Sequence, residues 1–528
     1  MKVLFLMDSP EYLRFYDTAV EELAARGHVV AVGVNSQRSK KPVGVEGLQA
    51  CADRVTVLGV VPMRTGFWAR AGLHVRALMD FVRFLHPDFA AARALRQRMK
   101  RKVLPRLYRS LDAIPRLKAS TVRRAIKALA GVERAIPLHA PIVQYLREQS
   151  PDVLLVSPLV TAASEQVEWV KAARACGIRS AVCVASWDNL TNKGLLRVRP
   201  DAVLVWNEAQ KREAVEFHYM PADTVVVTGA QLFDKWFERS VTYGREAFCQ
   251  RVGLPDARPF ILFTGSSSFI SETGAEVAFV RRWVQALRDS GNPELTNANI
   301  LVRPHPYNFH LWGSAPVSDL PGVAVFPRQG YNPIAPGNRN DFYDSLYHSA
   351  VVVGVNTSAM VEAAIIGRPV CSLLAPEFAG TQEGTIHFRH LLPENGGFLR
   401  IASTVEAHVE QLAQCLRDPA STRAETSRFV ASFIRPAGVE RPATPLFADA
   451  VERLAARPAL APVEPPSWRF LVWPPLALAT AAAAAVDAVL APDAGVRLRK
   501  WVRGAARPLV KRWEKRRARL KRDIDRAW

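Results

Sequence analysis

The residues with the clearest chemical potential lie between positions 351 and 370. This stretch reads as an apolar strand, a polar turn, an amphipathic helix and a second strand. Asn356, Thr357 and Ser358 occupy the turn, so their side chains and the first free amides of the helix can converge on an anion such as a diphosphate. Glu362 follows on the same helix face and can reach a ribose or sugar hydroxyl. Taken alone, Thr357 reads more simply as a plain N-cap and Glu362 as a solvated helix residue.

Two more polar turns follow apolar runs and fit the same ligand. Gly265, Ser266 and Ser267 offer backbone amides and hydroxyls to a diphosphate, as a phosphate nest does. In the Arg-Pro-His-Pro motif that begins at Arg303, flanking prolines hold the imidazole of His305. That imidazole can hydrogen-bond a phosphate or, when protonated, neutralise a leaving phosphate. Arg303 can add a bidentate phosphate contact. We therefore predict a donor-nucleotide site that includes both turns.

The first half of the chain carries the residues suited to an acceptor and a base. Asp8 follows the first apolar strand, where a carboxylate can take a proton from an acceptor hydroxyl. A dense polar loop follows another buried strand: Trp187 can stack on a sugar face, while Asp188, Asn189 and Lys193 supply acceptors and donors. Asp188 also suits a plain Asx turn. We predict acceptor contact at this loop, with Asp8 and Asp188 as the candidate catalytic carboxylates.

Strand and helix patterns alternate through most of the chain, which predicts an α/β fold with mostly parallel, doubly wound sheets. We expect a Rossmann-like domain at 1–235, interrupted by a basic helical insertion at about 64–135, and a second Rossmann-like domain at 236–457. Residues 458–528 form a basic tail. Two such sheets in tandem leave a cleft where the carboxyl ends of their strands face each other, and ligands bind there.

This arrangement, over residues 1–450, resembles the GT-B glycosyltransferase superfamily. In the second unit, three elements match in order: the turn at 264–267, the His-Pro motif at 303–306 and the segment 354–370. The His-Pro motif followed by a Ser/Thr pair at a helix start resembles the CDP-glycerol glycerophosphotransferases and the capsule-type Kdo and sialic acid transferases. The helix with Glu362 is more general and also resembles the UDP-N-acetylglucosamine 2-epimerases. The superfamily often places a loop at the sugar after the next strand, which suggests Gln382, Glu383 and His387.

The resemblance implies a transferase that moves a glycosyl group from a nucleotide-activated donor to a cell-surface glycan or lipid-linked acceptor. It implies that 1–235 is the acceptor domain and 236–457 the nucleotide-donor domain. The same site suits transfer of glycerol phosphate from CDP-glycerol. A nucleotide-sugar 2-epimerase is a second enzyme class, although it would not need a basic tail. A non-enzymatic membrane scaffold is the third alternative, and polar loops at both sets of strand ends argue against it.

Composition restricts the other possibilities. The chain has 528 residues, of which 49% are hydrophobic, so it can fold into two or more domains with full cores. Its six cysteines are scattered, with no CxxC pair and no histidine at zinc-ligand spacing, which predicts a reducing compartment and no structural metal. No Asp-x-Asp metal motif occurs in the two predicted domains, residues 1–457. We expect no metal and no cofactor, the nucleotide donor being a substrate. The short apolar N-terminus predicts a cytosolic domain and not a signal peptide.

The net charge of +21 is concentrated in two segments. Residues 64–134 hold 18 Lys/Arg against 4 Asp/Glu, and residues 497–528 hold 14 against 3. Such patches suit phosphate-rich partners. The chain carries no zinc finger, RNP-type aromatic strand or credible helix-turn-helix, so we predict an anionic membrane surface as partner and no nucleic acid.

The tail fits a peripheral anchor at the inner face of the cell membrane. Aromatic residues from Trp468 precede an alanine-rich stretch, and a strongly cationic segment with Trp501 and Trp513 follows. Tryptophan beside arginine is favourable at a headgroup interface. As a transmembrane span the stretch is poor, because prolines and Asp487 interrupt it. A solvated, partly disordered tail is the alternative.

Overall fold

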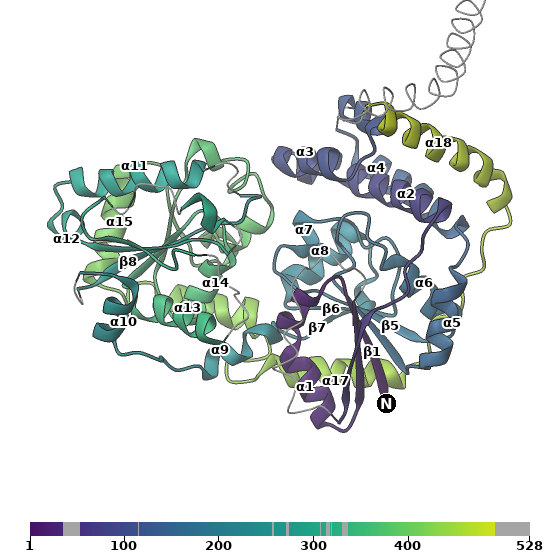
Figure 1. Ribbon diagram of the computed structural model, residues 1–528, viewed down its shortest axis with the longest axis horizontal. Helices are drawn as coiled ribbons and strands as arrows, with labels where there is room; N and C mark the ends of the chain where they lie inside the picture. Colours follow the sequence, from purple (N-terminus) through teal and green to yellow (C-terminus); the bar gives the residue numbers. More distant parts are fainter. Residues whose placement is uncertain are drawn as a thin grey trace, which may run out of the picture.

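The computed structural model describes residues 1–34 and 53–490, apart from short gaps at 115, 256–257, 271–273, 307, 313–316, 318 and 330–335. Two parallel sheets, each covered by helices on both faces, form the body of the molecule (Figure 1). The two doubly wound Rossmann-like domains predicted from the alternation of strands and helices are confirmed. The basic segment at 497–528, with Trp501 and Trp513, lies outside the described residues.

The first sheet has seven parallel strands in the order β3-β2-β1-β4-β5-β6-β7. The order reverses between β1 and β4, so their diverging connections leave a crevice at the carboxyl ends of these strands. Asp8 follows β1 directly at this switch point. The strands are β1 Lys2–Met7, β2 Val29–Val34, β3 Val55–Val60, β4 Val153–Ser157, β5 Arg179–Cys183, β6 Ala202–Val205 and β7 Val225–Val227.

Two apolar layers bury the faces of this sheet. The first contains Leu13, Tyr16 and Leu23, and the second contains Ile142, Trp169 and other side chains. Both layers pack on near-continuous apolar strands, as in parallel sheets buried on both faces. The connecting elements are η1 Pro10–Phe15, α1 Asp17–Ala25, α5 Ala140–Gln149, α6 Val167–Ala175, α7 Asn189–Asn192, α8 Glu208–His218, η5 Ala222–Thr224 and η6 Gln231–Phe233.

The second sheet has six parallel strands in the order β10-β9-β8-β11-β12-β13. Its order reverses between β8 and β11, and the predicted turns at Gly265 and Thr357 follow these two strands. The strands are β8 Phe260–Thr264, β9 Asn299–Arg303, β10 Val323–Val325, β11 Val351–Gly354, β12 Val370–Leu373 and β13 Arg400–Ala402. The helices are α9 Asp234–Glu238, α10 Arg245–Val252, α11 Ala275–Asp289, α12 Pro293–Thr296, α13 Pro336–His348, α14 Ser358–Ile365, α15 Val405–Arg417 and α16 Arg423–Phe429, with short 3₁₀ segments η7 Phe309–Leu311, η8 Pro376–Phe378, η9 His387–Leu391 and η10 Pro393–Asn395 and the π-helix η11 Val430–Ile434.

The chain crosses between the domains twice, and both crossings meet at Asp234. The buried carboxylate of Asp234 accepts hydrogen bonds from Arg435 at 2.7 and 3.0 Å and from the amides of Ala443 and Thr444 at 3.1 and 2.7 Å. Gly229 passes so close that a Cβ there would lie 2.7 Å from the Cβ of Ala443, and its φ of +84° also favours glycine.

After the second crossing, α17 (Ala443–Ala456) returns to the first domain. Phe447, Val451 and Leu454 are buried in the same apolar layer as α1, and α17 lies beside α1 in Figure 1. The predicted domain boundary at residue 457 is therefore wrong for α17, because the apolar face of this helix covers the first sheet and not the second.

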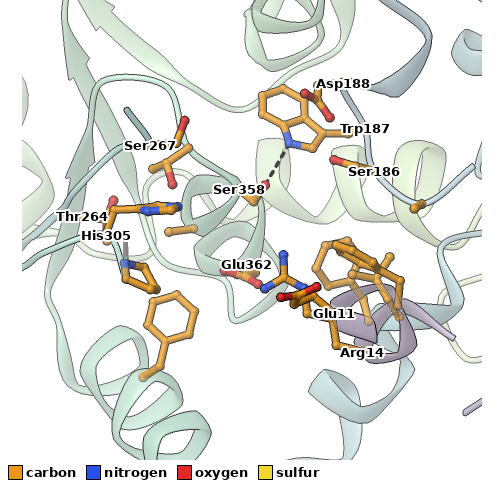
Figure 2. Close-up of a pocket in the computed structure, with 18 of the residues that line it drawn as sticks. Glu11, Arg14, Ser186, Trp187, Asp188, Thr264, Ser267, His305, Ser358 and Glu362 are labelled. Atoms are coloured by element: carbon orange, nitrogen blue, oxygen red, sulfur yellow. Dashed lines mark hydrogen bonds between the residues drawn. The ribbon is translucent and has the colours of Figure 1, made fainter. Parts of the chain in front are cut away.

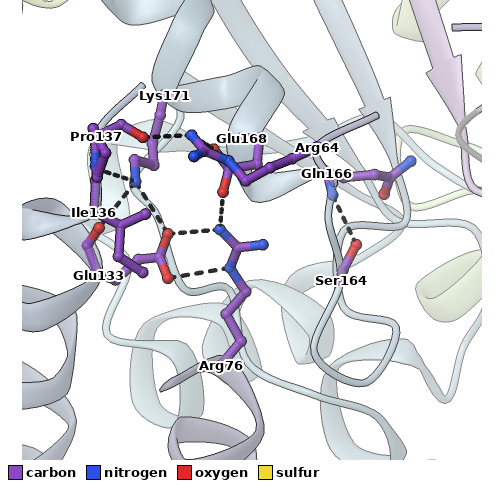
Figure 3. Close-up of polar contacts among 9 residues, drawn as sticks. All are labelled: Arg64, Arg76, Glu133, Ile136, Pro137, Ser164, Gln166, Glu168 and Lys171. Atoms are coloured by element: carbon purple, nitrogen blue, oxygen red, sulfur yellow. Dashed lines mark hydrogen bonds and ion pairs between the residues drawn. The ribbon is translucent and has the colours of Figure 1, made fainter. Parts of the chain in front are cut away.

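The basic insertion forms a helical layer on the first domain: α2 Phe67–Arg83, η3 Pro87–Phe89, α3 Arg93–Lys102, η4 Arg106–Ala113 and α4 Ala119–Ala135. A buried ionic network fixes this layer (Figure 3). Arg76 of α2 pairs with Glu133 of α4 at 2.8 Å and with Glu168 of α6. Lys171 and Arg64 pair with the same two carboxylates at 3.1 and 3.0 Å. The insertion is thus held rigidly against the sheet.

The described part of the tail contains the helix α18 (Arg469–Val489), which packs on α2, η4 and α4 (Figure 1). By length and composition alone, α18 is a candidate membrane span among the described residues.

Replacing Arg76 with methionine should destabilise the fold by about 3 kcal/mol, because both carboxylates lose their central buried partner. We place the cost at the low end of the usual range because Lys171 and Arg64 still neutralise Glu133 and Glu168. Urea denaturation gives the free energy of unfolding. Arg281→Met, at the exposed pair with Asp319, is the control and should leave it nearly unchanged, because exposed ion pairs contribute little to stability. Equal effects of the two variants would contradict the anchoring role.

Candidate active site

A cavity of about 740 Å³ lies between the two sheets, at the carboxyl ends of β1, β5, β8, β9 and β11. Figure 2 shows side chains from both domains pointing into it. The structure therefore brings the two halves of the predicted site together. The predicted residues that line it are Asp8, Trp187, Asp188, Asn189, Lys193, Gly265, Ser267, Arg303, His305, Asn356, Thr357, Ser358 and Glu362.

The N-terminus of α14 opens into this cavity. Thr357 holds the N-cap position with extended backbone (φ −149°, ψ 150°), yet its side chain makes no capping hydrogen bond. The simple N-cap reading of Thr357 therefore fails, and Thr357 lines the cavity at the start of the helix, where the amides of Ser358 and Ala359 have no acceptor within the helix. Such a helix end attracts an anion. Ser358 accepts a hydrogen bond from the indole of Trp187 at 3.1 Å and is partly engaged.

The turn after β8 contributes less than predicted. The amide of Ser266 donates to the carboxylate of Glu276 at 2.8 Å, and its carbonyl accepts from Asn308 at 2.8 Å. Ser266 is fully buried and does not line the cavity. The predicted phosphate contact of Ser266 is therefore wrong, because the α11 carboxylate already occupies its amide. Gly265 and Ser267 do line the cavity.

His305 lies at the end of β9 against Gly265. A Cβ at Gly265 would lie only 2.8 Å from the backbone nitrogen of His305, so glycine is required for the two turns to meet. Burial, with the nearby charge of Arg14, lowers the pKa of His305 to about 4. The imidazole is therefore neutral at pH 7, and a bound anion beside it would favour its protonation.

Arg303 does not offer a free phosphate fork. Its guanidinium donates to the Asp341 carbonyl at 3.2 Å and to the Ser345 hydroxyl at 2.8 Å, both on α13. It also lies over the ring of Phe342 at 5.2 Å. The bidentate phosphate contact predicted for Arg303 is wrong, because this buried side chain fixes α13 against the site.

Arg14 is the site residue that the sequence analysis missed. It lies in η1, and its guanidinium points toward Glu362 across the cavity in Figure 2. Its Nε is buried without a hydrogen-bond partner. Burial raises the pKa of Glu362 to about 7, with partial opposition from the positive charges of Arg14 and Arg239. The signal that could have identified Arg14 is its place in the connection that follows β1, at a switch point.

Trp187 joins the domains and is not an open stacking platform. Its side chain is 4% exposed and belongs to an apolar cluster shared by both domains. Its ring meets that of His387 edge-on with centroids 4.8 Å apart. Asn189 is equally enclosed: its side chain accepts from the amide of Ala185 at 3.1 Å and closes its own loop. The predicted sugar stacking by Trp187 and acceptor contact by Asn189 are therefore replaced by structural contacts.

Asp188 and Lys193 remain at the cavity wall. Burial would raise the pKa of the Asp188 carboxyl, but nearby Lys193 and His387 and hydrogen bonds from Ser186 and Asn192 hold it well below its usual range. A carboxylate so strongly stabilised is a weak base. Asp188 therefore suits a hydrogen-bonding role better than proton abstraction.

The loop after β12 orients the α14 turn. The Asn356 side chain donates to the Thr381 carbonyl at 2.6 Å and lies 3.2 Å from Nε2 of His387. Gln382 is fully buried and donates to Leu373 and Ser372, so it braces the loop, while Glu383 is exposed and does not line the cavity. Only His387 of the three loop residues reaches the site. Within the described ranges no group of three His, Cys, Asp or Glu side chains is placed to hold a metal ion.

Comparison with known proteins gives structural similarity only. No family model matches the chain. No curated protein matches it either. A UDP-GlcNAc 2-epimerase from Neisseria meningitidis bound to UDP-GlcNAc shares 11% identity over 86% of this chain and 100% of its own, with a TM-score of 0.48. A glycosyltransferase from Rickettsia africae ESF-5 shares 12% over 86% and 97%, at 0.47, and MurG from Acinetobacter baumannii shares 12% over 86% and 99%, at 0.39. The GT-B architecture itself follows from the two strand orders and the cavity between their carboxyl ends.

Glu362→Gln should stabilise the protein at alkaline pH and not at acid pH. Because the pKa of Glu362 rises from 4.5 to about 7 on folding, its contribution to stability is complete below pH 4.5 and is lost as pH rises through 7. Glutamine cannot ionise, so the Tm of the variant minus that of wild type should be near zero at acid pH and positive at alkaline pH. Thermal unfolding across this range measures it. The exposed Glu383→Gln is the control, and a pH-independent difference for Glu362→Gln would contradict the assignment.

Proposed function

We propose that this protein is a metal-independent glycosyltransferase that moves a sugar from a nucleotide-activated donor to a glycan or lipid-linked acceptor. The observation that carries the proposal is the N-terminus of α14, which opens into the same interdomain cavity that His305, Glu362 and Arg14 line. This set places a helix dipole, a hydroxyl, an imidazole and a guanidinium on the walls of one cavity. It is suited to hold a nucleotide diphosphate and to stabilise it as a leaving group.

The donor would lie on the second domain. Its phosphates would meet the first-turn amides of α14 and the hydroxyl of Thr357, with His305 on the β9 side. Burial raises the pKa of Glu362 to about 7, and its protonated carboxyl can both donate to and accept from a ribose or sugar hydroxyl. Arg14 comes from the first domain, so it would contact the donor only while the two domains enclose the cavity.

The reaction requires one proton to leave the acceptor. The acceptor hydroxyl oxygen bonds to the anomeric carbon, the bond from that carbon to the phosphate oxygen breaks, and the nucleotide departs with the electron pair. We assign the proton to Asp8, which lines the cavity at the end of β1 and accepts from Thr161 at 3.4 Å. Asp188 and Lys193 would orient the acceptor from the opposite loop. The positive charges and the α14 dipole would do the work that a metal does in other transferases.

The donor site is tested first by binding. Thermal-shift screening with UDP, CDP, CMP and GDP at equal concentration ranks the nucleotides, because a tighter ligand stabilises the folded state more. A preference for CDP would favour glycerol phosphate transfer from CDP-glycerol over sugar transfer, and stabilisation by none of them would contradict a nucleotide site.

His305→Ala, Thr357→Val and Arg14→Met should each weaken binding of the preferred nucleotide by at least tenfold, or about 1.4 kcal/mol, in calorimetric titration. Each variant removes one group that faces the phosphates. His310→Ala is the matched control, because His310 is an exposed histidine in the neighbouring η7 that does not line the cavity. Wild-type affinity in all three variants would remove the α14 end from the mechanism.

Asp8→Asn should lower kcat at least 100-fold, about 2.7 kcal/mol, while the nucleotide Kd stays the same, because only proton removal is affected. Asp188→Asn should raise the acceptor KM more than it lowers kcat. Transfer of labelled sugar measures both. Conversion of UDP-GlcNAc to its 2-epimer without any acceptor, followed by NMR, would instead identify an epimerase.

A further inference from the structure

The outward face of α18 is entirely apolar. The exposed positions of this helix recur every three or four residues and form one stripe: Phe470, Leu471, Pro474, Pro475, Leu478, Ala481, Ala485, Ala488 and Val489. Leu471 is 77% exposed and Leu478 is 73% exposed. A helix on the surface of a soluble domain normally turns its polar side to water. The pattern of α18 is the reverse, so the stripe is a surface that lacks its partner.

The inward face of α18 carries the polar contacts. The indole of Trp473 donates to the Ala135 carbonyl at 2.8 Å and packs edge-on against Trp68 at 5.3 Å. Thr480 is buried, and Asp487 accepts from the Arg106 amide at 3.4 Å. These contacts seat the helix along the insertion (Figure 1).

This seating decides the orientation of α18. At 21 residues, about 31 Å long, the helix is long enough to cross a bilayer. Crossing would require it to leave the insertion, which would expose the indole of Trp473 and the carboxylate of Asp487 to lipid. Lying in the plane of the interface keeps those contacts and buries only the stripe.

The layer that carries α18 is strongly cationic at its surface. The exposed Lys and Arg side chains of the insertion are Arg70, Arg93, Arg101, Arg116, Lys118, Arg123, Arg124, Lys127 and Arg134. Asp88 is the one exposed acidic residue among the described side chains of 64–135. Arg134 lies next to the place where α18 packs on α4, because Trp468, which directly precedes α18, contacts Gly131 one turn earlier in α4. A surface that combines an apolar stripe with flanking cations complements an anionic lipid surface.

We propose that the α18 stripe, together with the exposed cations of α4, is the surface by which this protein docks on an anionic bilayer, with α18 lying flat in the headgroup region. A second copy of the chain fits this face less well, because a twofold contact through α18 would bring two cationic insertions together. The proposal is independent of the reaction in the cavity. It differs from attachment by the positive charge of the tail alone, because it requires the apolar stripe itself.

The test uses the full-length chain and vesicles of phosphatidylcholine mixed with phosphatidylglycerol. Leu471→Glu/Leu478→Glu should lower the vesicle partition coefficient at least tenfold in flotation assays. The matched control is Val241→Glu/Val405→Glu, which places the same two charges at exposed apolar positions of the second domain. It should bind like wild type. Arg123→Gln/Arg124→Gln/Lys127→Gln should weaken binding and make it less sensitive to salt. All variants should keep the wild-type Tm, which shows that the seat of α18 is intact.

Three results would overturn the proposal. Wild-type partition by Leu471→Glu/Leu478→Glu would show that charge alone attaches the protein. Loss of a dimer by this variant in light-scattering measurements, with no vesicle binding by the wild-type chain, would assign the stripe to a second copy. Retention of wild-type protein on vesicles after an alkaline carbonate wash would show that α18 crosses the bilayer.

Discussion

The buried carboxylate of Asp234 is the interaction on which the geometry of the site depends. It binds Arg435 twice and caps the amides of Ala443 and Thr444, so the outward and return crossings of the chain share one anchor. A buried charge that satisfies four donors can hold only one arrangement of those donors. The first crossing leads into α9 of the second domain, and the return crossing leads into α17, which packs on the first domain. This anchor therefore determines how the two switch points face each other.

A second set of contacts joins the two domains at the wall of the cavity. The indole of Trp187 reaches the first residue of α14, and its ring packs on His387. The insertion contributes as well: Arg98 of α3 lies over the ring of Phe269 at 4.2 Å and within 3.4 Å of the Asn192 side chain, which in turn donates to Asp188. The same helical layer therefore carries α18 on its outside and touches the acceptor loop on its inside. The position of an acceptor held at the α18 surface would thus be fixed relative to the cavity.

Much of the fold could be predicted from the sequence, because strand and helix periodicity records which faces are buried. The same alternation placed Asp8, Gly265 and Thr357 at strand ends, and the structure brings all three into one cavity. The errors concern the partners of individual side chains. The amide of Ser266 donates to a carboxylate ten residues away, and the guanidinium of Arg303 donates to a helix about forty residues away. Spacing along the chain predicts which edge of a sheet a residue reaches, but not which neighbour satisfies it there.

Two of the cavity groups with shifted pKa values, His305 and Glu362, would couple anion binding to protonation. Burial holds His305 neutral, with its pKa near 4, and raises the pKa of Glu362 to about 7. A diphosphate between them would favour the imidazolium and disfavour the carboxylate, so both pKa values would rise together. The positive charge of Arg14 opposes both of these changes, since it lowers both pKa values. A phosphate that pairs with Arg14 removes that opposition. The departing nucleotide would therefore meet a site whose charge becomes more positive in response to it, which is the property that a metal ion would otherwise supply.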